Sequence, residues 1–212
     1  MRRLVKALTI CATLAIMAGC ISYEQHATFE SDGSGRIVVD TWVAYFNGDE
    51  EGGPTEKESA QLEISEELGP AFVDLEGVTI EENWTRLEGE DEERREHTHL
   101  VLGFDKVERL NGHGIFKNQN LTFQKKGDEF AFGQVIHNER KEEQEETTEE
   151  SEELARTLFE GYTFTYTVVM PGRVIDTGGT VGEDGRTVKW EWPLYDFANE
   201  EEIVMTATSQ KE

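Results

Sequence analysis

Residues 162–170 read Tyr-Thr-Phe-Thr-Tyr-Thr-Val-Val-Met, the clearest pattern in this chain of 212 residues. Large apolar side chains alternate with threonine, and a period of two is typical of a β-strand with one buried face. Residues 187–194 show the same alternation, with apolar side chains at Val188, Trp190, Trp192 and Leu194. We therefore expect two strands whose aromatic faces point toward the same apolar interior.

Earlier segments of the chain have strand character and occur in pairs. A Gly-containing or charged turn separates the two members of each pair, as in a β-hairpin. The predicted strands are 23–30 with 36–46, 78–87 with 94–104, 121–124 with 129–137, and a final strand at 203–208. Strand 36–46 is apolar on both faces, so we expect a helix or an apolar ligand to cover its second face.

Three segments have helical signals. Thr55 precedes Glu58 at capping-box spacing, and apolar residues then recur every four positions to Leu68, which predicts a helix over 56–68. One or two helical turns are expected at 105–110, and a helix at 148–160. The prediction is a single α+β domain over residues 20–212, with a mostly antiparallel β-sheet built from hairpins and about three packed helices. Residues 138–153 are rich in Glu and predict a mobile acidic insert.

The N-terminus has the pattern of a secretory leader. Arg2, Arg3 and Lys6 precede an uncharged run that ends at Met17-Ala18-Gly19-Cys20. The run is shorter than the roughly 20 residues that span a bilayer, and its end resembles the lipobox of bacterial lipoproteins. The resemblance implies a signal peptide at 1–19, acyl chains on Cys20, and attachment to the cell membrane or envelope on the extracytoplasmic side. An ordinary cleaved signal is the alternative.

Charge and motifs argue against several classes of function. The formal net charge of −25 disfavours nucleic acid as a partner. Cys11 and Cys20 are the two cysteines, and Cys11 lies in the leader, so a thiol enzyme is not expected. The chain has no G-x-S-x-G motif and no nucleotide-binding glycine loop. We expect a non-enzymatic protein without a cofactor.

One sequence motif suggests a metal. His97 and His99 are two residues apart on a predicted strand, so they share a face, and His113 or His137 could join them. A zinc site needs three or four ligands and supporting hydrogen bonds. Because the opposite face of this strand is the apolar one, we expect both histidines to face water and predict no metal site.

Several short motifs resemble the LppM-type family of bacterial lipoprotein domains. They are Asp32-Gly33-Ser34-Gly35, Val168-Val169-Met170-Pro171-Gly172-Arg173-Val174, Gly178-Gly179, Gly185-Arg186-Thr187-Val188-Lys189-Trp190 and the closing strand at 203–209. The resemblance implies an envelope lipoprotein with mostly antiparallel strands and helices.

Two functions are compatible with these observations. The first is a binding module that holds a lipid or glycolipid in an apolar groove, and the second is an envelope interaction or scaffolding protein without a small ligand. The residues expected to line the groove or the core are Trp42, Phe164, Tyr166, Trp190 and Trp192. A cavity would favour the first function, and a filled core the second.

Overall fold

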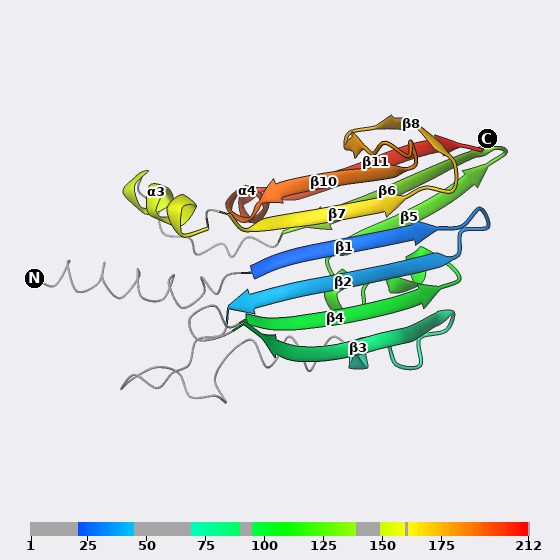
Figure 1. The fold of residues 1–212 in the computed structure, drawn as a ribbon. Helices are drawn as coiled ribbons and strands as arrows, with labels where there is room; N and C mark the ends of the chain where they lie inside the picture. The colour runs from blue at the N-terminus through cyan, green and yellow to red at the C-terminus, as the bar shows by residue number, and fades with distance from the viewer. Residues whose placement is uncertain (1–20, 45–68, 90–94, 139–148, 160, 212) are drawn as a thin grey trace, which may run out of the picture.

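Two β-sheets pack face to face in the computed structural model, which describes residues 21–44, 69–89, 95–138, 149–159 and 161–211. One sheet has seven strands in the order β3-β4-β2-β1-β7-β10-β9, and the other has four in the order β5-β6-β11-β8 (Figure 1). The apolar side chains between them form one continuous core.

The strands are β1 (Ile21–Phe29), β2 (Gly35–Ala44), β3 (Val78–Glu88), β4 (Arg95–Phe104), β5 (Gln119–Lys126), β6 (Glu129–His137), β7 (Thr163–Val169), β8 (Arg173–Thr177), β9 (Thr180–Val181), β10 (Thr187–Pro193) and β11 (Glu202–Gln210). The α-helices of the described residues are α3 (Glu149–Leu158) and α4 (Leu194–Asn199). Single turns of 3-10 helix occur at η1 (Pro70–Phe72), η3 (Val107–Leu110) and η4 (Gly114–Phe116).

The predicted hairpins β1–β2, β3–β4 and β5–β6 are present, each paired antiparallel. The pairing of β1 with β7 is parallel, with Tyr23 opposite Phe164. Parallel neighbours require a long crossover connection, and here that connection contains the β5–β6 hairpin of the second sheet. The chain therefore visits the four-stranded sheet before it completes the seven-stranded one.

Strand alternation explains the core. Most inward positions of β1, β2, β4 and β7 carry apolar side chains, whereas their neighbours point away from the core; the buried polar exceptions are Gln25, Thr41 and Thr98. Large side chains less than 2% exposed include Phe29, Ile37, Leu100, Leu102, Leu121, Tyr166 and Met205. Aromatic rings connect the two sheets: the ring of Phe132 on β6 lies 5.5 Å from Phe29 on β1 and 6.3 Å from Trp190 on β10.

The prediction of an α+β fold with about three packed helices is wrong, because the protein is mostly β and its two sheets cover each other. Helix α3 does form within the predicted range 148–160, but the described contacts of Arg156 are with α4, where it meets Asp196 at 3.6 Å and Tyr195 at 4.4 Å. The expected turns at 105–110 form the 3-10 helix η3. A sheet whose apolar face is covered by a second sheet needs no helical layer.

Residues 171–185 hold two strands where we expected a turn region. After β7 the chain crosses to the four-stranded sheet as β8, which pairs with β11, and returns to the seven-stranded sheet as β9, which pairs with β10. Helix α4 was also not predicted; its Phe197 is buried and stacks on Phe164 at a centroid distance of 3.9 Å. Strands β8 and β9 are both short, and the pairing of β8 depends on β11, which is distant in the sequence.

Several predictions fall outside the described residues. These are the leader at 1–19, Cys20, the helix at 56–68 and most of the acidic insert. In the parts of the chain that the structure describes, no helix is long and apolar enough to cross a membrane.

Candidate functional site

The five aromatic residues predicted to line a groove or core lie on two faces of the seven-stranded sheet. Tyr166 and Trp190 are buried on the inner face, where they are 2% and 7% exposed, and Phe164 and Trp192 pack against the same core. Trp42 is half-buried on the outer face, because it alternates with the core residues Thr41 and Val43. The structure therefore separates Trp42 from the other four.

The outer face around Trp42 is ordered by the register of β3, β4 and β2. Residues directly opposite one another in neighbouring strands share a face. In one row of paired residues across the three strands, His99 lies between Trp84 and Asp40. In the next row on the same face, His97 lies between Arg86 and Trp42. These two rows bring the predicted histidine pair beside an aspartate and two tryptophans.

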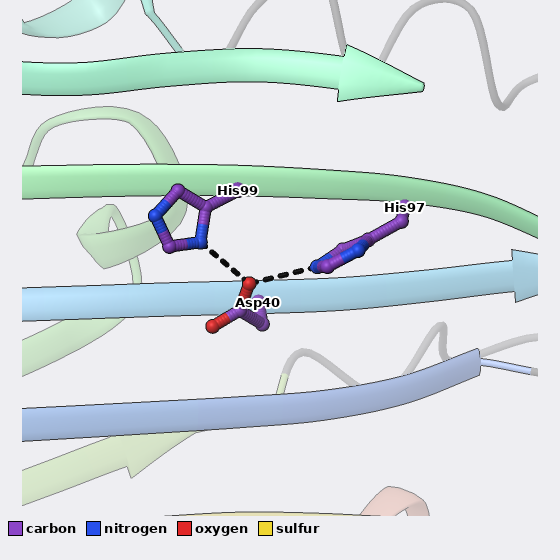
Figure 2. Close-up of side chains that lie close together, drawn as sticks. All are labelled: Asp40, His97 and His99. Carbon is purple, nitrogen blue, oxygen red and sulfur yellow. Dashed lines mark hydrogen bonds and ion pairs between the residues drawn. The ribbon is translucent and has the colours of Figure 1, made fainter. Parts of the chain in front are cut away.

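Asp40 joins the two histidines (Figure 2). Its Oδ1 lies 2.8 Å from Nε2 of His97 and 2.7 Å from Nδ1 of His99. The two histidines project from β4 and the aspartate from β2, and all three side chains converge on one oxygen atom. One carboxylate oxygen can accept both N–H bonds because it has two lone pairs.

The second nitrogen of each imidazole also faces a carboxylate. Nδ1 of His97 lies 3.1 Å from Oε1 of Glu88, and Nε2 of His99 lies 3.7 Å from Oε2 of Glu82. Hydrogen bonds from His97 and then from Arg86 hold the pKa of Glu88 below its ordinary value. A neutral imidazole has one N–H and can donate to only one of its two carboxylates at a time.

Two indole rings enclose the histidines. Trp42 stacks on His97 at a centroid distance of 4.5 Å, and Trp84 stacks on His99 at 4.8 Å. The guanidinium of Arg86 lies 4.2 Å from the centre of Trp84 and is ion-paired with Glu88. The aromatic contacts fix the planes of both imidazoles and keep much of the surrounding water away.

The expectation that both histidines face water is therefore wrong. The side chain of His97 is 10% exposed, that of His99 18% and that of Asp40 21%, although all three lie on the face opposite the core. The third side chain beside His97 and His99 is Asp40 and not His137. His137 lies on β6 of the other sheet and approaches Glu202.

The aspartate was missed because its position depends on register. Asp40 interrupts the apolar outer face of strand 36–46, which is a visible anomaly in the sequence. Its pairing with His99, 59 residues away, follows from the antiparallel alignment of β2 with β4. If β2 were shifted by one residue relative to β4, the side chain of Asp40 would point toward the core instead of toward the histidines.

Chemically, the cluster is a set of convergent electron-pair donors. One oxygen of Asp40 and one nitrogen each of His97 and His99 all lie within 4.8 Å of one another. Such an arrangement can hold protons between the groups, as in the structure, or replace them with a cation.

No known protein family model matches the chain, and no curated protein matches it in sequence. Among solved structures, the chain is similar to the folded domain of Mycobacterium tuberculosis LppM, determined by NMR. The similarity covers 91% of each chain, with 12% sequence identity and a TM-score of 0.45. This chain is therefore similar to the LppM folded domain over most of its length.

Proposed function

We propose that this protein is a lipid-anchored, non-enzymatic binding protein of the bacterial envelope, and that it meets its partner through the outer face of the seven-stranded sheet. Acyl chains on Cys20 attach it to the extracytoplasmic side of the membrane. The observation that carries the proposal is the cluster around Asp40, which is enclosed and ordered on the face that the core does not use.

The lipid anchor is supported by the sequence Met17-Ala18-Gly19-Cys20 at the end of a charged and then apolar leader. The similarity to a lipoprotein domain agrees with an envelope location. Substitution of Cys20 tests this part. Cys20→Ser should move the protein from the membrane fraction to the soluble fraction and remove the acyl mass from the intact protein. An unchanged membrane fraction would refute the anchor.

The choice of the outer face is supported by the packing of the inner one. Tyr166 and Trp190, predicted as groove residues, fill the space between the sheets together with Phe132 and Phe197. Residues that already contact one another in a filled core do not need a ligand to bury them. The outer cluster, in contrast, places hydrogen-bonded polar groups on the face that does not contact the other sheet.

Photo-crosslinking in the producing bacterium tests the partner face. A crosslinking amino acid at Lys189, an exposed position on the outer face of the seven-stranded sheet, should capture a partner. The same group at Gln124, exposed on the other sheet, is the matched control. Crosslinks from Gln124 alone would contradict the proposed face.

A lipid or glycolipid held in an apolar groove is the competing function. Native mass spectrometry before and after organic extraction distinguishes it. We expect a mass without bound lipid and an unchanged melting temperature. A lipid that leaves on extraction, with a fall in melting temperature, would favour the groove instead.

A further inference from the structure

We infer that Asp40, His97 and His99 form a binding site for a divalent transition-metal ion of the zinc class. This inference goes beyond the proposed function and does not depend on the lipid anchor. Two imidazoles and one carboxylate are the donor set that zinc and its neighbours prefer, and three protein ligands leave one coordination position for water or a ligand.

The distances are close to those of a coordination site. Ligand atoms about 2.0–2.1 Å from a tetrahedral zinc ion lie roughly 3.3 Å apart. In the structure, Oδ1 of Asp40 lies 2.8 Å from His97 and 2.7 Å from His99, and all three ligand atoms lie within 4.8 Å of one another. Small side-chain movements would therefore admit an ion at the point where the two N–H groups now meet the carboxylate.

The surroundings have the second layer of contacts that metal-binding histidines use. A histidine ligand normally donates its other N–H to a carboxylate, which orients the ring and raises its basicity. Glu88 occupies this position for His97, and Glu82 lies 3.7 Å from the outer nitrogen of His99. Binding an ion at Nε2 of a neutral His97 would move the imidazole proton to Nδ1. The Nδ1–H group would then donate a hydrogen bond to Glu88, and the imidazole would keep its proton.

Aromatic stacking also prepares the site. Trp42 and Trp84 hold the imidazole planes of His97 and His99 before an ion arrives, which lowers the entropy cost of binding. Trp84 also contacts the guanidinium of Arg86, which lies 4.2 Å from the centre of the indole ring.

The charge of the protein favours a cation. Glu24 lies directly opposite Asp40 on β1, and Glu82 and Glu88 lie beside the histidines. Together with the net charge of −25, these carboxylates make the local potential negative. Histidine ligands distinguish this site from the many surface carboxylates, since hard ions such as Mg²⁺ prefer oxygen alone.

The test is titration of the full-length protein, produced with its own leader, purified in detergent and stripped with a chelator. Zn²⁺ is added in excess Mg²⁺, which occupies nonspecific carboxylates, and binding is followed by calorimetry. We expect saturable binding of one ion per chain. Co²⁺ should give the visible absorption bands of a histidine- and carboxylate-bound ion.

Matched variants locate the ion. Asp40→Asn and His99→Gln should each weaken Zn²⁺ binding at least 100-fold, and Glu88→Gln about 10-fold to 100-fold, because it only supports His97. His26→Gln is the control, since His26 lies on the same face of the sheet and is exposed; its affinity should stay within about twofold of the parent protein.

Two results would overturn the inference. One is the absence of saturable Zn²⁺ or Co²⁺ binding to the parent protein, which would make the cluster a hydrogen-bonded structural element alone. The other is a His99→Gln titration that superimposes on the parent curve, which would place the ion elsewhere. If Asp40→Asn fails to fold, the Co²⁺ spectrum of the parent protein and the His99→Gln titration still decide. Because the titration reports the metal alone, its failure would leave the crosslinking and membrane-fraction tests unaffected.

Discussion

A row of hydrogen-bonded side chains crosses the core between the two sheets. The hydroxyl of Tyr23 donates to Gln25, whose amide donates to Gln134 at 3.1 Å, and Gln134 donates to Gln119 at 2.6 Å. Gln119 in turn donates to the carbonyl oxygen of Ile115. Burial raises the pKa of Tyr23 well above its ordinary value, so its hydroxyl remains a donor. Every donor in the row points the same way, which strengthens each bond.

Replacing Gln134 with Met breaks this row at its centre while keeping the length of the side chain. Gln25 is 1% exposed and cannot exchange its lost acceptor for water, which costs about 1–3 kcal/mol. Gln119 is half-buried and loses a hydrogen bond worth about 1 kcal/mol. We therefore expect Gln134→Met to lower the free energy of unfolding by about 2–4 kcal/mol.

The double variant gives the sharper result. Gln25→Met alone should cost a similar amount, because it removes the acceptor of the Tyr23 hydroxyl and the donor to the Gln134 carbonyl oxygen. The two substitutions together remove both amides, so the bond between Gln25 and Gln134 is lost only once. The double variant should therefore cost at least about 1 kcal/mol less than the sum of the single variants.

Urea unfolding followed by tryptophan fluorescence measures all three variants, and an unchanged m-value shows that the same transition is compared. Gln124→Met is the control, since Gln124 is exposed on the outer face of β5, and it should change the unfolding free energy by less than about 0.5 kcal/mol. Additivity of the two core substitutions within about 0.5 kcal/mol would refute the reasoning, because independent sites add to that accuracy.

Two further predictions concern the segment around β8 and β9. Gly172→Ala would place a Cβ 2.2 Å from the carbonyl oxygen of Gln210 and should cost about 1–3 kcal/mol in urea unfolding, whereas Gly178→Ala meets no atom within 4 Å and should cost little; equal losses would contradict the close approach. Hydrogen bonds, the largest from the Thr187 hydroxyl, lower the pKa of Asp184 to about 2. The ionised Asp184 therefore stabilises the fold at pH values above 3.8, the ordinary pKa of the group. This stabilisation is lost as the pH falls toward 2. Thr187→Val should raise the pKa of Asp184 in a carboxyl NMR titration, and an unchanged midpoint would count against the hydroxyl.

Much of the local structure could be predicted from the sequence. The alternation in residues 162–170 and 187–194 placed strands β7 and β10, and turn residues between apolar runs placed the hairpins. These features depend on the side-chain period of two and on local backbone preferences, both of which act within a few residues.

The fold class could not be predicted in the same way. An apolar strand face is stabilised equally well by a helix or by a second sheet, so the pattern itself did not exclude the packed helices that we expected. The short strand β8 depends on β11, which lies about 30 residues later, and the parallel pair β1–β7 joins segments about 140 residues apart.

The sequence by itself determined where most of the strands lie and which of their faces are apolar, and it predicts a lipoprotein-type leader before Cys20. Only the tertiary structure decided that Trp42 lies on the opposite face from Trp190, and that Asp40 joins His97 and His99. The physical reason is register: the contacts of a side chain across a sheet depend on how two distant strands align, and the energy that selects this alignment comes from the whole core.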